Sequence, residues 1–391
     1  MWRAAMPDKP TVHWLENGGA REARWHSERG APPPKRVMIA DDRMTADEAY
    51  GHACQGVALL WRGDFHNARQ MLIALANRAD RSQRRSGKTM APLGSAAIAA
   101  AFNLERQARA QRARTLAMLL MELGEDLSID LQRAPDIRLA VSEALGPGAG
   151  SGLISLRALL GIVGAHEWSI KGIDIPAVGG RIHPHYGVFA PIRGEYVELV
   201  AKAPLPEVLA SCDLAFDIGT GTGVLAAVLA RRGVGRVLAT DQDPRALVCA
   251  RENLDRLGLL AGVDVQQADL FPEGRAALIV CNPPWLPARP SSPLEHAIYD
   301  PESRMLHGFL HGLATHMVPG GEGWLILSDL AEHLGLRSRS SLLAAFEAAG
   351  LKVVDRIDAL PTHPRASDPT DPLYAARKAE VTSLWRLRQG A

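Results

Sequence analysis

The stretch LAFDIGTGTG, from Leu214 to Gly223, decides how the rest of the chain is interpreted. Apolar and small residues lead into Asp217, three alternating glycines follow, and an apolar run starts at Val224. This order predicts a buried strand, a tight turn and a helix, because glycine lacks a Cβ and lets the backbone bend sharply and approach a ligand. A nucleotide-like cofactor is therefore expected at this turn.

The spacing of the glycines and the residues beyond them narrow the choice of cofactor. A dinucleotide-binding turn has the spacing GxGxxG, but the position of its third glycine is Val224 here. The sequence also lacks the GxxxxGK[ST] pattern of a phosphate-binding loop. A second predicted strand, RVLATD, ends on Asp241, where a carboxylate can accept both hydroxyls of a ribose. These features disfavour NAD, ATP and GTP as the cofactor. A different cofactor that contains a ribose is still expected.

Two further motifs follow at the ends of predicted strands. VDVQQADLF places Asp269 after a third strand, and ALIVCNPPW places Asn282 and Trp285 after a fourth. Together, DIGTGTG, TDQD, ADLF and NPPW resemble the class I S-adenosylmethionine (SAM) dependent methyltransferases of the NPP-aromatic branch, which methylates planar nitrogen. Within that branch the motifs are most similar to the release-factor glutamine methyltransferases of the methyltransferase small domain type. Adenine-N6 and ribosomal RNA methyltransferases resemble them next.

The resemblance implies SAM as the cofactor and assigns residues to its site. The cofactor-binding residues are then Asp217, Gly219, Thr220, Gly221, Gly223, Asp241, Gln242, Asp269, Leu270 and Asn282. The catalytic residues are Asn282, Pro283, Pro284 and Trp285. We expect no metal, because His307 and His311, four apart on a predicted helix, lack an HExxH pattern and a nearby carboxylate ligand.

The NPPW motif suggests how the reaction is catalysed. An amide or exocyclic amine is a poor nucleophile because its lone pair is delocalised. If the Asn282 side-chain oxygen and the Pro283 carbonyl each accept one N–H, the lone pair is turned toward the methyl group. The two prolines stiffen this turn, and Trp285 offers an aromatic face to the planar group. We expect positioning to supply most of the catalysis, without a separate general base.

The segment before the glycine turn, residues 179–200, is expected to form a roof over the cofactor site. In the glutamine methyltransferases a short hairpin and a Pro-Arg-Pro-Glu-Thr-Glu segment stand at this place. Pro191, Arg193, Glu195 and Glu198 resemble that segment, whereas Gly194 and Tyr196 depart from it. The predicted substrate or roof residues are Tyr186, Phe189, Arg193 and Glu195.

The remaining sequence predicts four regions. Residues 1–43 lack a helical or alternating period and are expected to be a disordered tail, with Met38 and Met44 as alternative starts to Met1. Residues 44–150 are expected to form a helical N-terminal domain for substrate or partner recognition, entered through a capping box at Thr45 and Glu48. Residues 151–200 would form a linker, hairpin and roof, with LGPGAGSG as the linker and WSIKGIDI as a strand.

Residues 201–391 are expected to form the methyltransferase domain. Strands that alternate with helices predict an α/β fold with a mainly parallel sheet and helices on both faces. The resemblance implies a Rossmann-like sheet of seven strands. KVVDRIDAL and VTSLWRLRQ would form its antiparallel edge hairpin.

Charge and cysteine content bear on partners and location. The net charge of +1 excludes neither protein nor nucleic acid, but nine basic residues lie between Arg78 and Arg114 against two acidic ones. This cluster is either a solvated helix face or a docking surface for RNA or an acidic protein. The sequence has no signal-peptide core and no apolar run long enough to span a membrane. The isolated cysteines are expected to be reduced core residues of a cytoplasmic protein: Cys54, Cys212, Cys249 and Cys281.

These observations lead to a SAM-dependent N-methyltransferase as the predicted function. A glutamine side chain of a translation protein, either a translation factor or a ribosomal protein, is the first choice of substrate. An RNA or DNA adenine amine is the second, because of the basic cluster. A SAM-binding regulator without catalysis and a nicotinamide oxidoreductase are the third and fourth interpretations.

Overall fold

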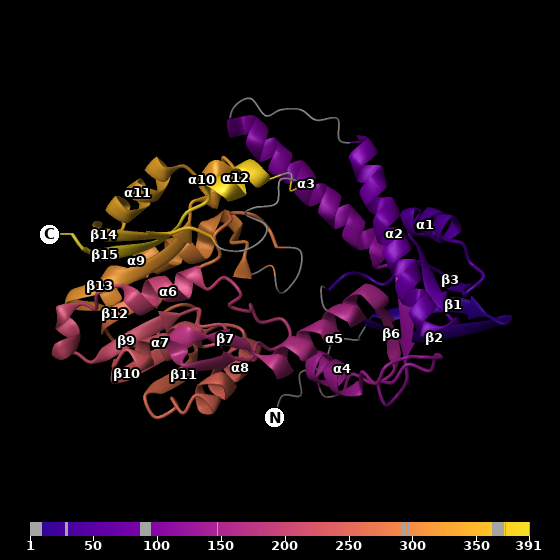
Figure 1. Cartoon of the computed structure of the whole chain (residues 1–391), viewed down its shortest axis with the longest axis horizontal. Helices are drawn as coiled ribbons and strands as arrows, with labels where there is room; N and C mark the ends of the chain where they lie inside the picture. The colour runs from indigo at the N-terminus through magenta and orange to yellow at the C-terminus, as the bar shows by residue number, and fades with distance from the viewer. Residues whose placement is uncertain are drawn as a thin grey trace, which may run out of the picture. The chain divides into compact units, whose positions relative to one another are not determined.

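The computed structural model describes residues 10–27, 30–86, 95–146, 148–290, 295, 297–361, 371 and 373–390. The chain divides into two compact units (Figure 1). The first unit comprises Met1–Ala91 and Asn103–Glu167, and the second comprises Pro92–Phe102 and Trp168–Ala391.

The first unit is built on a six-stranded mixed sheet with the order β1-β2-β6-β5-β4-β3. Its strands are β1 (Thr11–Glu16), β2 (Gly19–His26), β3 (Arg36–Ala40), β4 (Val57–Trp61), β5 (Leu119–Leu123) and β6 (Gly152–Ser155). Its helices are α1 (Ala46–Cys54), α2 (Phe65–Ser86), α3 (Ser95–Leu116), α4 (Arg138–Leu145) and α5 (Leu156–Lys171), with α3 and α5 crossing the division between the units. The pairs β1–β2 and β5–β6 are antiparallel, and the other neighbours are parallel.

The prediction of a disordered tail over residues 1–43 is wrong for the described residues 11–26 and 36–40, which form β1, β2 and β3. Val12 and Trp14 are buried on one face of β1, and Trp25 joins their core from β2. The hairpin turns at Asn17 and Gly18, with φ of 51° and 76°. An Asn-Gly pair favours this two-residue turn because both residues tolerate positive φ.

The prediction of a helical N-terminal domain over residues 44–150 is confirmed for the helices α1, α2, α3 and α4 but is wrong in leaving out the strands β4 and β5. The capping box of α1 is confirmed, since the Thr45 side chain accepts from the Glu48 amide and the Glu48 side chain accepts from the Thr45 amide. However, the short apolar runs at β4 and β5 are strands paired in the interior of the sheet, where both faces are covered and no polar alternation is needed. The expected linker ends in β6, and Trp168–Ile175, expected as a strand, is divided between α5 and β7 (Ile173–Ile175).

The second unit contains a seven-stranded sheet with the order β11-β10-β9-β12-β13-β15-β14. Its strands are β9 (Leu214–Ile218), β10 (Arg236–Asp241), β11 (Val263–Gln267), β12 (Ala276–Cys281), β13 (Met317–Ser328), β14 (Leu351–Ala359) and β15 (Thr382–Gln389). The first five strands in the sheet order are parallel, and β15 is antiparallel to both of its neighbours. The prediction of a mainly parallel α/β sheet with an antiparallel edge hairpin is therefore confirmed.

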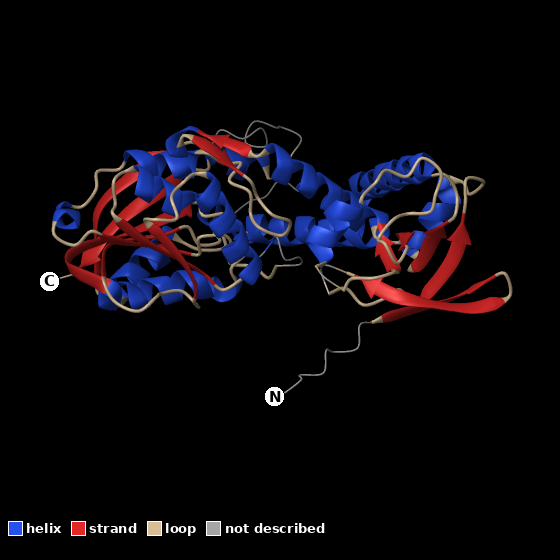
Figure 2. Ribbon diagram, turned by 90° about the horizontal axis from the view of Figure 1, so that it is seen from below, coloured by secondary structure: helices blue, strands red, loops and turns tan. Residues whose placement is uncertain are grey.

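Helices cover both faces of this sheet (Figure 2). The helices are α6 (Glu195–Lys202), α7 (Val224–Arg231), α8 (Pro244–Arg256), α9 (Arg304–His316), α10 (Leu330–His333), α11 (Arg339–Ala348) and α12 (Tyr374–Ala379), with 3-10 turns at Pro176–Val178, Glu207–Ala210 and Pro301–Ser303. Residues of α6, α7 and α8 form one apolar core with the strands, and residues of α9 and α11 form another. The predicted hairpin of the roof segment is β7 paired with β8 (Gly180–Ile182).

The strand order reverses between β9 and β12, which is the topological switch point of the sheet. The chain leaves β9 toward β10 on one side and returns from β11 to β12 on the other side of β9. Ligands of open α/β sheets bind at the carboxyl ends of the strands at such a reversal. The glycine turn and the NPPW motif both start there, because Cys281 of β12 pairs with Ile218 of β9.

Within the described parts of the chain, no helix combines the length and the apolar character needed to cross a membrane. The expectation that all four cysteines belong to the core is wrong for Cys54, which is exposed, and Cys212 is only partly buried. Cys249 and Cys281 are buried, and burial raises the pKa of the Cys249 thiol to about 11.

Candidate active site

The glycine turn joins β9 to α7 and is held tightly against a neighbouring helix. Gly219, Gly221 and Gly223 have φ of 72°, 55° and 82°, a left-handed backbone that glycine adopts without strain. A Cβ on Gly223 would lie 3.2 Å from Cα and Cβ of Ala250 in α8. Glycine is therefore required at Gly223 for conformation and for space.

The buried Asp217 carboxyl group stabilises the glycine turn through hydrogen bonds. Its Oδ2 accepts hydrogen bonds from the Thr220 hydroxyl at 2.6 Å and from the Ala226 amide at 3.0 Å. The side chain is buried, and burial raises the pKa of the Asp217 carboxyl to about 6. In the structure, Asp217 and Thr220 thus organise the turn, while the contacts predicted for them with a cofactor stay predictions.

Asp241 lies at the carboxyl end of β10 and is tied to the same turn. Its Oδ2 accepts from the Gly221 amide and its Oδ1 from the Asp243 amide, both at 3.0 Å. The group is largely buried, and this burial raises the pKa of the Asp241 carboxyl. A carboxylate oxygen can accept two hydrogen bonds. Each oxygen of Asp241 therefore keeps capacity for a ligand hydroxyl.

The motif after β11 contributes a strained backbone rather than a buried carboxylate. Leu270 has a φ of 79°, and its carbonyl accepts from the Thr240 hydroxyl at 2.6 Å. Asp269 is exposed and pairs with Arg304 at 2.7 Å. Gln242 is exposed as well, and its carbonyl accepts from the Gln267 side-chain amide at 3.2 Å.

The structure adds Met305 and Asp300, which the sequence analysis did not single out. A Cβ on Gly219 would lie 2.6 Å from Cε of Met305, so this methyl group rests on the glycine turn. Buried Asp300 accepts from the Met305 and Leu306 amides at 3.1 Å and caps α9. An Asp before a proline and a helix is a recognisable cap signal. Nothing in the sequence links that helix to the glycine turn.

The NPPW turn follows β12, and its polar groups are connected to each other. The indole N–H of Trp285 donates to Oδ1 of Asn282 at 2.9 Å. Pro283 is buried, while Asn282 and Trp285 are partly buried. The Arg193 guanidinium lies 4.7 Å from the centroid of the Trp285 ring. One face of the predicted aromatic platform is therefore covered by a residue of the roof.

The roof segment is anchored by Arg193, which contacts three acceptors. It donates to Oε1 of Glu195 at 2.6 Å, to Oε1 of Glu380 at 2.9 Å and to the Thr382 hydroxyl at 3.4 Å. Both carboxylates are buried. The structure thus joins Arg193 and Glu195, predicted as roof residues, to Glu380, which sequence reasoning missed. Its separation from Arg193, 187 residues, left no local signal.

Two other predicted roof residues have different surroundings. The Tyr186 hydroxyl is buried and has no hydrogen-bond partner within the described ranges, and Phe189 is partly buried. His307 and His311 are exposed on α9, and the His311 ring contacts the His307 carbonyl at 2.7 Å.

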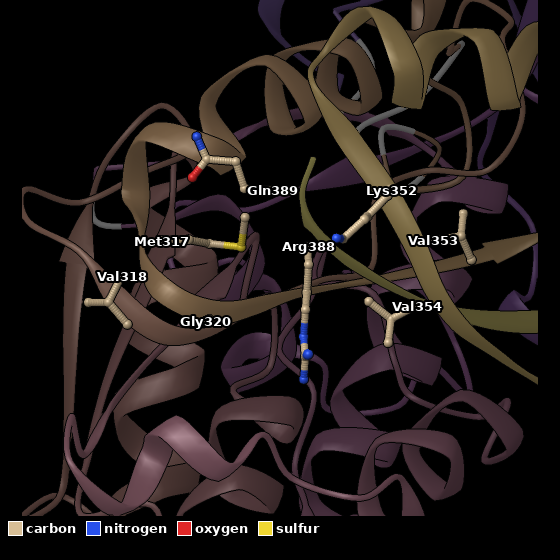
Figure 3. A pocket seen from close by; sticks show the side chains of 9 residues that line it. Met317, Val318, Gly320, Lys352, Val353, Val354, Arg388 and Gln389 are labelled. Atoms are coloured by element: carbon tan, nitrogen blue, oxygen red, sulfur yellow. The ribbon is translucent and has the colours of Figure 1, made fainter. Parts of the chain in front are cut away.

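A cavity of about 450 Å³ lies elsewhere in the second unit (Figure 3). It is lined by the start of β13, including Met317, by the start of β14, including Lys352, and by Arg388 and Gln389 near the end of β15. Because β13 runs parallel to β12, this cavity is at the amino end of the parallel strands. It is therefore distinct from the NPPW turn and the glycine turn.

Comparisons with known proteins agree with this arrangement. Residues 201–349 match the family model "Methyltransferase small domain". The chain is 32% identical over 254 residues to the ribosomal protein L11 methyltransferase of Allorhizobium ampelinum, covering 63% of this chain and 76% of that protein. It is 32% identical over 176 residues to the release factor glutamine methyltransferase of Cereibacter sphaeroides, covering 41% and 58% of the two chains.

A third relative is the ribosomal protein L11 methyltransferase of Pelotomaculum thermopropionicum, with 37% identity over 143 residues. That match covers 36% of this chain and 39% of the relative. The Pelotomaculum and Cereibacter proteins are thus each matched over less than two thirds of their length.

Proposed function

Because the chain belongs to the class I SAM-dependent methyltransferases, we propose that it transfers the methyl group of SAM to a planar nitrogen. The observation that carries this proposal is the NPPW turn. Asn282 follows the strand next to β9, so its side chain starts beside the glycine turn. This is the place where a methyl acceptor and the cofactor would meet.

The residues of the site fit SAM. Asp241 keeps acceptor capacity on both oxygens, as a ribose diol requires, and Gly221 beside it has no side chain, with open space where a Cβ would be. SAM supplies an electrophilic methyl group when bound. Asp241 would hold the ribose, and the backbone of the turn would line the site.

Asn282 and Pro283 would orient the methyl acceptor. The Asn282 Oδ1 can accept two hydrogen bonds, of which the Trp285 indole uses one. The other would accept an N–H of the substrate, and the Pro283 carbonyl would accept the second N–H. The nitrogen lone pair is then directed at the methyl group. Alignment of this kind is worth up to about 7–11 kcal/mol in favourable cases.

A protein side-chain amide, on a translation factor or a ribosomal protein, is the acceptor that we favour. The names of the relatives, a ribosomal protein L11 methyltransferase and a release factor glutamine methyltransferase, support a protein acceptor. In the basic segment, Arg78, Arg109 and Arg112 are ion-paired with acidic side chains at 2.6–2.7 Å. These pairs reduce the charge available for phosphate groups. A nucleic-acid base amine is the alternative.

The acceptor class can be measured directly. Purified protein would be incubated with methyl-labelled SAM and a cell extract, and the product would be divided between protease and nuclease treatments. A protein acceptor gives a macromolecular label that survives nuclease and is lost with protease. A label lost with nuclease alone would replace the protein acceptor with a nucleic acid.

A further inference from the structure

Trp285 does more than present a ring, because its indole nitrogen determines the orientation of Asn282. An indole N–H can only donate a hydrogen bond. The atom of the Asn282 amide at 2.9 Å from it must therefore be the oxygen, and the amide nitrogen must point away. Phenylalanine at this position would keep an aromatic face but would leave the amide free to rotate.

Arg193 in turn restrains Trp285. Its guanidinium stacks 4.7 Å from the ring centroid, and the same group is held by Glu195, Glu380 and Thr382. Glu380 is itself held by the Ser328 hydroxyl at 2.6 Å. Arg193 thus connects the roof, the end of β13 and the start of β15 to the ring of Trp285.

The charges of this network explain why an arginine occupies its centre. The side chains of Glu195 and Glu380 are 3% and 0% exposed, so one guanidinium faces two buried carboxylates. Oε2 of each carboxylate has no partner within the described residues. A planar guanidinium can bind two carboxylates in fixed directions and still stack on an aromatic ring, which a lysine ammonium cannot do. The two buried carboxylates therefore fix the position of the Arg193 guanidinium.

We propose that Arg193 is a positioning residue, which acts through Trp285 to hold the Asn282 oxygen in the orientation that accepts the substrate N–H. The effect on catalysis rests on the proposed function. The effect on the orientation of the Asn282 amide does not rest on it, because that orientation can be measured in the protein without ligand. Arg193 then belongs to the catalytic arrangement without contacting the acceptor.

The first test follows the Trp285 indole proton in the ligand-free full chain by nuclear magnetic resonance. The Trp285 signal is identified by its loss in Trp285→Phe. In Arg193→Lys the indole proton should exchange with solvent about ten-fold faster, because the ring is released from the amide. The control is Arg339→Lys, since Arg339 stacks 5.4 Å from the ring of a different tryptophan, Trp385, and pairs with Glu332 at 2.8 Å. Unchanged exchange in Arg193→Lys would overturn the proposal.

The second test measures methyl transfer from labelled SAM into a cell extract. Trp285→Phe keeps an aromatic ring and the three acceptors of Arg193, so we expect this variant to fold even if Arg193→Lys unfolds. Each single variant should lose about ten-fold in turnover with SAM affinity unchanged. Turnover of the double variant should be no more than about two-fold below that of the less active single variant, because both substitutions act on the same Asn282 amide. Losses of turnover that multiply in the double variant would overturn the proposal.

A wild-type protein that transfers no methyl group contradicts the proposed function, while the exchange experiment still tests the positioning of Asn282 by Arg193 and Trp285.

Discussion

Asp241 is the residue on which cofactor recognition depends most in this account. Replacement of Asp241 by Ala removes acceptors for the ribose, and charge-assisted hydrogen bonds contribute about 1.5–3 kcal/mol each. Calorimetric titration should therefore show SAM affinity reduced by at least about ten-fold. Asp264→Ala, an exposed change on β11, is the matched control and should leave affinity unchanged. Equal SAM affinities of Asp241→Ala and Asp264→Ala would show that Asp241 does not bind the cofactor.

Asp217 should make the stability of the ligand-free protein depend on pH. The folded state keeps a proton on this carboxyl up to about pH 6, whereas the ordinary pKa is 3.8. Between these values the native state binds more protons than the unfolded chain, so the free energy of unfolding falls as pH rises. The total effect is about 3 kcal/mol.

Urea unfolding of wild type and Asp217→Asn between pH 4 and pH 8 measures this effect. The stability of Asp217→Asn relative to wild type should increase with pH through this window and then level off above about pH 6. Parallel pH profiles of the two proteins would contradict a raised pKa at Asp217.

Among the elements, the glycine turn and the strands around it were predictable because their signals are local. Glycines with positive φ, a carboxylate at a strand end and NPPW after an apolar run each occupy a few adjacent residues. The β1–β2 hairpin was also marked locally, by Asn17-Gly18 and the alternation of Val12 and Trp14. This alternation covers only a few residues, so residues 1–43 taken as a whole show no period and predict a tail instead.

Trp14 should contribute strongly to the stability of the first unit. It is 7% exposed and packs with Val12 and Trp25. Trp14→Ala should cost about 3–5 kcal/mol of unfolding free energy, because large-to-small changes lose burial and leave a cavity. Thermal unfolding followed by circular dichroism would detect this loss. Leu15→Ala on the opposite face, where Leu15 is 73% exposed, should change stability by less than about 0.5 kcal/mol. Equal stabilities of both variants would mean that β1 does not pack.

At the scale of the whole molecule, the parts of the site that were missed come from distant segments. The partners of Arg193 in the last strand region, Glu380 and Thr382, are separated from it by 187 and 189 residues. Such long-range ion pairs form only once the sheet has assembled, and they leave no characteristic spacing in the sequence. The six-stranded sheet of the first unit was missed for a related reason, since its interior strands lack polar alternation and can be mistaken for helix.

The first unit therefore differs from the helical domain that the sequence analysis predicted, because it is built on a six-stranded sheet. Its role in recognising the substrate or a partner stays a prediction. The second unit contains the glycine turn, the roof and NPPW, so the proposed chemistry needs only residues of that unit.

The most direct test of the central claim compares wild type with Asn282→Ala in methyl transfer from labelled SAM, alongside calorimetric SAM binding. Asn282 would position the acceptor nitrogen, whereas the nucleoside would be held mainly by Asp241 and the glycine turn. The account predicts SAM affinity within about three-fold of wild type and a loss of turnover of at least about a thousand-fold. Turnover by Asn282→Ala close to that of wild type would contradict nitrogen positioning by the NPPW turn.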